Sequence, residues 1–430
     1  MFTKEKIKEY KLVDMLICLV IVSSIALRKL KLLLYLIQAV FIVVGCKELL
    51  NKTYKSFWLF RILYFFWMLL SIYWSRDVSS VLSVIPSIIQ ILVLTLIMCG
   101  YIDDNYKIDR MIDMFVLAGF SLLISILIFT PLSEWKDIIF YSSNKYVNVA
   151  GSVGRLGPSV GMHSNGLGQT LVVCIMCIFY RFIKTKKKLL LLLMILLLIL
   201  TFLGKSRSSL IEVFCGIFLI YTFSKKNTAK QIFYFVLGGC LLVVGLYLLI
   251  NIPFFYKIIG YRLEGLALFG NSQGADASTV TRLYFVKIGW KLFFDNPIFG
   301  VGMNNFSYIA FNEFSTWAKV YSHNNYIEIL SNLGIIGFFL YYYLYFKSFM
   351  ILTNLINKTK NSNKLSDIYE KAAFLLAMLL VFAIMNVSHI TYETECVQYM
   401  GMIIIIGSIL LNKKYNEMYK INGKEEQRGI

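Results

Sequence analysis

Charged residues, prolines and histidines are all scarce in this sequence. Only 16% of its 430 residues are charged, and it holds five prolines and three histidines. Soluble globular chains carry about 25% charged residues, so this composition excludes an ordinary soluble enzyme and a disordered protein. The eight cysteines lie mostly within apolar runs, which is typical of packing residues and excludes a disulfide-stabilised scaffold.

Hydrophobic residues are abundant and gathered into long runs. They make up 58% of the chain, in stretches such as 189–203 and 238–250. Apolar runs of this kind, repeated along a chain, predict membrane-spanning helices. We therefore predict an all-α polytopic membrane protein with about twelve transmembrane helices, at 12–27, 30–50, 57–74, 81–99, 111–130, 165–183, 188–203, 208–224, 230–250, 330–349, 371–388 and 396–411.

The formal net charge of +19 comes mainly from Lys and Arg in loops between these runs. They are more numerous on the side that holds both termini, and the positive-inside rule then predicts cytoplasmic termini and no nucleic-acid partner. Arg28, Lys29 and Lys31 depart from this pattern because they fall outside. The predicted divisions are residues 1–250 with nine spans and a minor outer loop near 131–164, a large extracytoplasmic loop at 251–329, three spans within 330–411, and a cytoplasmic tail at 412–430.

All three histidines map to the predicted outer side. Ser322 is a candidate N-cap, and the apolar spacing after it places His323 on the first turn of a helix leading into the tenth span. The positive end of a helix favours neutral imidazole, the form that accepts a proton as a general base does. His163 is a candidate substrate contact, and His389 is interpreted as a hydrogen-bonded interfacial residue.

Three arginines share the same predicted side. Arg207 is either a snorkelling interfacial residue or, with Lys205 and Ser206 and the serines that follow, part of a donor site for phosphate at a helix start. Arg155 lies in a glycine-rich stretch that permits close backbone approach to a ligand. Arg282 opens a stretch that reads as an amphipathic interfacial helix ending near residues 295–297, and its cations also suit anionic lipid head groups.

The outer acidic residues show no metal-ligand spacing, and no nucleotide-binding or hydrolase motif is present. We therefore expect neither a catalytic metal nor another cofactor. An outer face with arginines and a candidate base suits anionic, lipid-linked substrates, although these residues alone do not fix the reaction.

Several motifs in the chain resemble those of the O-antigen polymerase and O-antigen ligase superfamily of bacterial envelope enzymes. They are the stretch GRLGPSVGMHSNGLG before the sixth span, the pair Ser206 and Arg207, the segment TRLYFVKIGWKLFFDNPIFGVGMNNF, and SHNNYIEILSNLGIIG. The last two are the most specific: an arginine, an aromatic helix, NP-x-x-G-x-G, and then H-N-x-Y at a loop-to-helix junction. The likeness is detailed from about residue 150 to 340 and elsewhere extends to topology.

The resemblance implies a metal-independent glycosyltransferase of the GT-C type in the bacterial cytoplasmic membrane, with its active face outside. Its donor and acceptor would be undecaprenyl-diphosphate-linked glycans. Carried over to this chain, Arg207 and Arg282 would hold the diphosphate, and His323 would orient or deprotonate the acceptor hydroxyl. The neighbouring Asn324 and Asn325 then become candidate substrate contacts, and a flippase and a chain-length regulator become candidate partner proteins.

The family contains polymerases, which join lipid-linked repeat units, and ligases, which move finished glycan to another acceptor. A polymerase for capsule, O-antigen or exopolysaccharide is favoured here, because the Lys-, Ile- and Asn-rich composition is typical of AT-rich genomes, and many such bacteria make capsules and lack lipid A. A lipid-linked oligosaccharide flippase is the alternative from another class. It would place polar groups along its spans, and only Arg61, Gln90 and Glu212 lie there.

Overall fold

The computed structural model describes residues 4–47, 54–140, 155–256, 277–316 and 318–428, and within these ranges it contains helices and no strands. The helices are α1 (Lys4–Ala26), α2 (Lys31–Gly45), α3 (Lys55–Leu70), α4 (Val78–Tyr101), α5 (Asn105–Phe129), α6 (Leu132–Phe140), α7 (Ser164–Thr185), α8 (Lys188–Leu203), α9 (Arg207–Phe223), α10 (Thr228–Asn251), α11 (Pro253–Phe255), α13 (Ala277–Asp295), α14 (Asn305–Glu313), α15 (Asn325–Thr359), α16 (Ser366–Ser388) and α17 (Glu395–Arg428). Short 3₁₀ turns occur at η3 (Ser71–Tyr73) and η5 (Pro158–Val160).

Each of the twelve predicted spans coincides with one of these helices. Among the described residues, eight helices are long and apolar enough to cross a membrane, and α1, α2 and α8 contain shorter apolar stretches. The remaining predicted span, at 208–224, corresponds to α9, which has 17 residues and begins at a buried arginine. The prediction of an all-α polytopic membrane protein is therefore confirmed, because apolar runs in lipid must satisfy their backbone hydrogen bonds within a helix.

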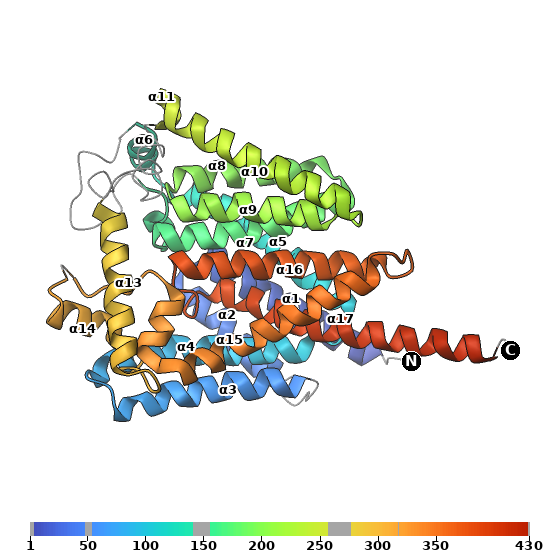
Figure 1. The fold of residues 1–430 in the computed structure, drawn as a ribbon, viewed down its shortest axis with the longest axis horizontal. Helices are drawn as coiled ribbons and strands as arrows, with labels where there is room; N and C mark the ends of the chain where they lie inside the picture. The colour runs from blue at the N-terminus through green and yellow to red at the C-terminus, as the bar shows by residue number, and fades with distance from the viewer. Residues whose placement is uncertain (1–3, 48–53, 141–154, 257–276, 317, 429–430) are drawn as a thin grey trace.

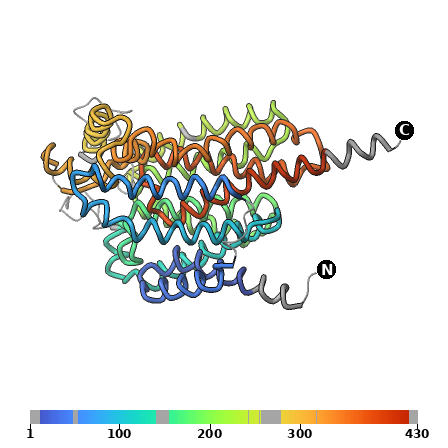
Figure 2. Tube along the Cα trace, turned by 90° about the horizontal axis from the view of Figure 1, so that it is seen from below, coloured from blue at the N-terminus to red at the C-terminus, as the bar shows by residue number. Residues whose placement is uncertain are grey.

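The long helices lie side by side, and α7, α16 and α17 are the most buried of the eight candidate spans (Figure 1). Helix α13 crosses one end of this bundle, next to α14 and to the first turns of α15. The start of α1 and the end of α17 lie at the opposite end (Figure 2). The hairpin at Arg28 and Lys29 contacts Gly161, so this exception to the charge pattern lies at the same end as the glycine-rich stretch.

Several helices begin at side chains that the sequence supplies as caps. The carboxylates of Asp77 and Asp104 accept hydrogen bonds from the backbone N–H groups of Ser80 and Lys107, at the starts of α4 and α5. Asn227 does the same for Lys230 at the start of α10. Such caps satisfy helix N–H groups that have no partner within the helix, each at a gain of about 1 kcal/mol.

Helix α15 is broken at Gly334, which has a φ of 64°. The loop that follows α13 closes the break: Val301 N–H and Gly302 N–H donate to the carbonyls of Ser331 and Asn332, at 2.9 and 2.8 Å, and Ile335 N–H donates to Pro297 O at 2.9 Å. A Cβ at Gly300 would lie 2.4 Å from the Asn332 carbonyl carbon. The NP-x-x-G-x-G motif is thus a backbone brace for a broken helix.

The helix also begins at Asn325, before the predicted start of the tenth span at residue 330. Its first turns run up to the break at Gly334, and the continuous apolar segment begins after it. Sequence periodicity did not reveal this break, because the loop residues that stabilise it lie about 30 positions earlier in the chain.

An ion cluster joins α5, α7 and α16 at the end of the bundle opposite α13. Lys371 is 3% exposed, and its Nζ lies 2.8 Å from Asp109 Oδ2 and 2.9 Å from Asp367 Oδ2. Arg181 pairs with Asp109 as well, at 3.1 Å. Asp109 on α5 is the shared partner, because it pairs with Lys371 of α16 and with Arg181 of α7, and the cluster thereby links the three helices.

We expect Lys371→Met to lower the stability of the protein. The substitution removes the buried cation that pairs with both Asp109 and Asp367. Loss of one member of a buried ion pair costs roughly 3 kcal/mol, and the remaining partners Arg181 and Lys184 reduce that cost. The thermal unfolding midpoint in detergent, measured against Lys358→Met on the exposed surface of α15, checks this. Equal midpoints for the two variants would show that the cluster contributes nothing.

Candidate functional site

The predicted donor site at Lys205, Ser206 and Arg207 lies at the start of α9. Ser206 is the residue before the first helical residue, and Arg207 opens the helix, 8% exposed. Helix α7 packs tightly against this turn through Gly168, where a Cβ would lie 2.1 Å from Ser209 Oγ. A helix start with an arginine and neighbouring hydroxyls has the polarity that anions require.

Arg155 ties the glycine-rich stretch to the same turn. Its Nε donates to Gly204 O at 3.2 Å and its Nη2 donates to Asn165 Oδ1 at 3.1 Å. His163 caps α7, where its Nδ1 accepts from Asn165 N–H at 3.3 Å. Residues 155–165 and 204–207, predicted separately as donor segments, are therefore brought together by direct contacts.

His323 lies between two aromatic rings. Its imidazole centroid is 4.2 Å from that of Tyr321 and 6.2 Å from that of Phe285 on α13, with which it is nearly parallel. The backbone of His323 has a φ of 58°, in the left-handed region that few non-glycine residues adopt. Its Nδ1 is buried and has no hydrogen-bond partner among the described residues. A strained residue with an unsatisfied ring nitrogen is a frequent feature of functional sites.

Electrostatic effects show which charged groups surround the histidines. Burial first, and then the charges of Arg282, His389 and His163, lower the pKa of the His323 imidazole to about 3. Desolvation first, and then Arg155, His389 and Arg282, lower the pKa of His163. The three histidines, Arg155 and Arg282 therefore share one region at the end of the bundle that α13 crosses, although they come from distant parts of the chain.

The predicted cap of the His323 segment is wrong. Asn324, and not Ser322, caps α15: its Oδ1 accepts from the N–H groups of Tyr326 and Ile327 at 3.0 and 3.1 Å. His323 therefore precedes the helix and is not on its first turn. Ser322 serves the turn before the cap, where its N–H donates to Glu328 Oε2 at 2.7 Å and its hydroxyl donates to Asn324 O at 2.9 Å.

The candidate substrate contacts Asn324 and Asn325 both have structural partners. Asn325 is fully buried, its Nδ2 donates to the Tyr342 hydroxyl at 2.7 Å, and its Oδ1 accepts from Thr391 N–H at 2.9 Å. These bonds fix the loop after α16 against the start of α15. Their role as substrate contacts stays a prediction. The hydrogen bonds of both side chains stabilise the segment that carries His323.

Helix α13 presents Arg282 and ends at Asp295, near the predicted stop. Its buried side is apolar: Phe285 and Ile288 pack with Phe306 and Ile309 in a small second core. Its exposed side carries Trp290 and Phe294 as well as cations, which is the composition expected of a helix at a membrane surface. That this surface lies on lipid stays a prediction.

Two residues near this site, His389 and Glu212, had been given other roles in the sequence analysis. His389 Nε2 lies 2.8 Å from Ser208 Oγ and 3.3 Å from Glu212 Oε1, so this histidine belongs to the region around α9. Glu212 has no exposed surface, and its Oε2 has no hydrogen-bond partner among the described residues. The sequence signal for Glu212 was a carboxylate inside an apolar helix that begins with an arginine. Its neighbour His389 is distant in the sequence and was revealed only by the tertiary structure.

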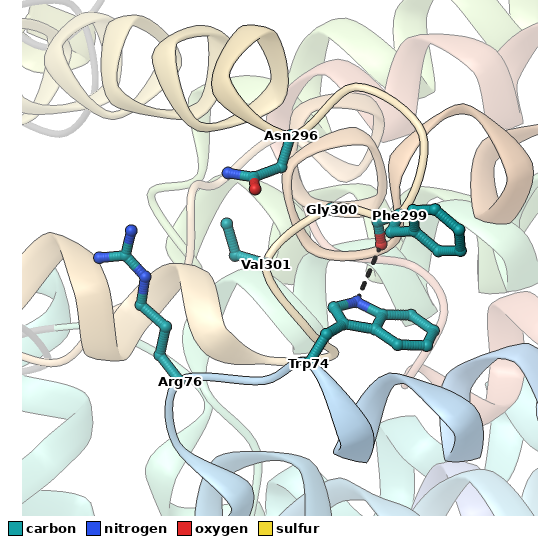
Figure 3. A pocket seen from close by; sticks show the side chains of 6 residues that line it. All are labelled: Trp74, Arg76, Asn296, Phe299, Gly300 and Val301. Carbon is teal, nitrogen blue, oxygen red and sulfur yellow. Dashed lines mark hydrogen bonds between the residues drawn. The ribbon is translucent and has the colours of Figure 1, made fainter.

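A cavity of about 370 Å³ lies elsewhere on this end of the protein, and none of the predicted site residues lines it (Figure 3). It is bordered by the loop after α13 and the turn after α3, where Trp74 Nε1 donates to Phe299 O at 3.2 Å. The lining residues are Trp74, Arg76, Asn296, Phe299, Gly300 and Val301. Within the described residues, no group of three or more His, Cys, Asp or Glu side chains has the arrangement of a metal site.

The fold and the site together define a polytopic helical membrane protein with a cationic, histidine-containing site at one end of its bundle. Residues 189–342 match a family model described as O-antigen ligase. The match extends from α8 into the first half of α15 and includes Arg207, Arg282 and His323. It confirms the resemblance to the O-antigen polymerase and ligase superfamily and supports a function of that general type. No curated protein sequence matches the chain.

Proposed function

We propose that this protein is a polymerase of lipid-linked oligosaccharide repeat units. The observation that carries the proposal is the convergence of Arg155, Arg282 and His323 with the start of α9 at one end of the bundle. Guanidinium groups bind phosphate in a fixed, forked geometry, and a nearby neutral imidazole accepts a hydrogen bond from a hydroxyl. A diphosphate-linked donor and a sugar acceptor need these two kinds of group together.

In the proposed reaction, a hydroxyl oxygen of the acceptor attacks the anomeric carbon of the donor glycan. The bond between that carbon and the diphosphate oxygen breaks, and the polyprenyl diphosphate leaves with the electron pair. Arg207 and Arg282 stabilise the negative charge that develops on the leaving group, which is the main source of rate enhancement in such sites. His323 orients the attacking hydroxyl and receives its proton. The reaction needs no metal.

The ionisation of His323 fits this order of events. The pKa of its imidazole is lowered to about 3 in the substrate-free protein by burial and by Arg282. A bound diphosphate places negative charge beside Arg282 and opposes that effect, so it raises the basicity of His323 when the donor is present. The imidazole is thus neutral before the reaction and better able to take a proton once the donor is bound.

We further propose that the site faces the outside of the bacterial cytoplasmic membrane and that both termini are cytoplasmic. The support is the charge pattern, because loops at the end that holds the termini are rich in lysine, among them Lys186, Lys225 and Lys364. Undecaprenyl-diphosphate-linked glycans would then be both donor and acceptor, with a flippase that supplies them and a chain-length regulator as partner proteins.

Ligation is the second candidate function, and the description of the matched family as O-antigen ligase favours it. A ligase uses the same donor chemistry and differs in its acceptor, which is a lipid-anchored or other final carrier. The arginines and His323 serve either reaction. The product therefore distinguishes the two functions where the site does not.

The test is the glycan profile of cells that lack the protein and of cells complemented with it. Loss of a polymerase leaves single lipid-linked repeat units, and complementation restores long chains. Loss of a ligase leaves long lipid-linked chains that never reach their final acceptor. A glycan profile that is the same with and without the protein would reject both functions and favour a transporter or a structural role.

A further inference from the structure

A buried glutamate, a histidine and a serine meet beside the start of α9. The His389 Nε2 atom lies within hydrogen-bond distance of two oxygens, at 2.8 Å from Ser208 Oγ and at 3.3 Å from Glu212 Oε1. The Ser388 hydroxyl also donates to Glu212 Oε1, at 3.0 Å. Glu212 and His389 are buried, whereas Ser208 is half-buried and is thus the member of the group nearest to the surface.

The two oxygens around Nε2 determine where the hydrogen lies. A ring nitrogen without hydrogen has a single lone pair in the ring plane and accepts one good hydrogen bond, whereas an N–H group is readily shared between two acceptors. An ionised carboxylate accepts and never donates. Because Nε2 contacts both Glu212 and Ser208, the arrangement is satisfied when Nε2 carries the hydrogen and both oxygens accept it.

This assignment fixes the direction of the Ser208 hydroxyl. Its oxygen accepts from His389, so its own hydrogen points to another partner. Within the protein that partner is Ser206 Oγ, at 3.3 Å, and Ser206 Oγ already accepts from Ser209 at 3.0 Å. A hydroxyl donor prefers about 2.7–2.8 Å, so the contact with Ser206 is a poor one. A stronger acceptor that approaches Ser208 replaces it.

We propose that the Ser208 hydroxyl donates a hydrogen bond to a phosphate oxygen of the substrate, and that Glu212 and His389 are positioning residues that hold it in the donor direction. The inference rests on the proposed function, since it deepens the account of the diphosphate site next to Arg207. Phosphate is the acceptor that fits, because Ser208 follows the arginine that opens the helix and the helix start favours negative charge.

The position of Glu212 explains why a charged residue is kept in the apolar helix α9. A buried carboxylate without partners is costly, and here the Ser388 hydroxyl donates to Glu212 Oε1 while His389 Nε2 lies 3.3 Å from the same oxygen. The carboxylate in turn fixes the tautomer of His389, in the way that carboxylates orient histidines at many catalytic sites.

The test measures by calorimetry how tightly the full-length protein in detergent binds inorganic diphosphate. Ser208→Ala is expected to weaken binding roughly 10- to 100-fold, the range for one hydrogen bond to a charged group. Ser208→Thr keeps the hydroxyl and is expected to retain most of the affinity. Glu212→Leu removes the acceptor that fixes His389 and is expected to weaken binding by a smaller factor.

A double variant separates positioning from a general structural effect. Because Glu212 acts through Ser208, Glu212→Leu is expected to have no further effect on binding in the Ser208→Ala protein. Glu212→Gln, whose amide oxygen still accepts from Nε2, should lie between the wild type and Glu212→Leu. Ser224→Ala, at the other end of α9, is the matched control and should bind as the wild type does.

Three results would overturn the inference: Ser208→Ala that binds diphosphate as tightly as the wild type, additive losses in the double variant, or a wild-type protein that does not bind diphosphate. Failure of the proposed function looks different. In that case the wild type binds diphosphate and shows the pattern above, yet cells that lack the protein make normal glycan chains.

Discussion

Cells that carry His323→Ala at normal protein level are expected to accumulate single lipid-linked repeat units and to make almost no polymer. A group that orients and deprotonates a hydroxyl contributes about 10²- to 10⁴-fold to the rate, so loss of the imidazole removes most of the transfer. His323 is half-buried between Tyr321 and Phe285, and no other described side chain bonds to its Nδ1. The measurement is the chain length of the polysaccharide.

The pH dependence of the reaction gives a second readout for His323. The neutral form of an imidazole exists above its pKa, and the pKa of His323 is lowered to about 3 by burial first and Arg282 second. As pH falls from 8 to 5, His323 therefore stays neutral in the substrate-free enzyme, whereas an ordinary histidine would become charged. The acid limb of kcat/KM is thus expected to be the same in the wild type and in His323→Gln, which has no ionisable group.

The matched control for His323→Ala is Lys319→Ala, an exposed residue of the same loop whose Nζ lies 5.2 Å from the centre of the Tyr308 ring. It should leave chain length unchanged. Long chains that are made in His323→Ala cells but never attached to a final carrier would identify a ligase instead. Normal polymer and normal attachment would remove His323 from the mechanism.

Arg282→Lys is the second change with a large expected effect, although it keeps the positive charge. Lysine is a point charge on a flexible stem, whereas arginine offers two parallel donors to a phosphate. Loss of one fixed donor to a developing negative charge costs about 10²- to 10³-fold in rate. We therefore expect the variant to make little polymer and to keep a normal unfolding temperature.

The control for this variant lies on the same helix. Lys287 is exposed on α13, five residues after Arg282, and Lys287→Ala removes a cation without touching the proposed site. It should retain nearly full activity. If Arg282→Lys is as active as the wild type, a forked contact with the diphosphate is excluded and only the charge at this position matters.

The amino-acid pattern predicted the all-helical fold class well, because lipid offers no hydrogen-bond partners and an apolar run must therefore pair its backbone groups within a helix. Apolar runs such as those of α8 and α10 have one stable structure in a bilayer, the helix. The end of α13 at Asp295 also followed from local signals. What failed locally was the choice between Ser322 and Asn324 as a cap, because both side chains are able to accept backbone hydrogen bonds and the preceding turn decides which one does.

The break in α15 could not be predicted from the local sequence around Gly334, and the reason is different. Gly334 alone signals flexibility, and only the contacts of Val301, Gly302 and Ile335 with distant backbone make the broken helix stable. The same holds for Asn325, which looks like a motif residue for substrate and is a buried bridge to the loop at Thr391.

The sequence alone determined that this is a helical membrane protein, and it predicts outward-facing arginines and a histidine suited to anionic, lipid-linked substrates. Those features follow from local composition and from the cost of burying polar groups in lipid. The partnership of Glu212 with His389 and Ser208 was decided only by the tertiary structure. Residues 177 positions apart share no local signal, and hydrogen bonds act only over the few ångströms to which folding brings them.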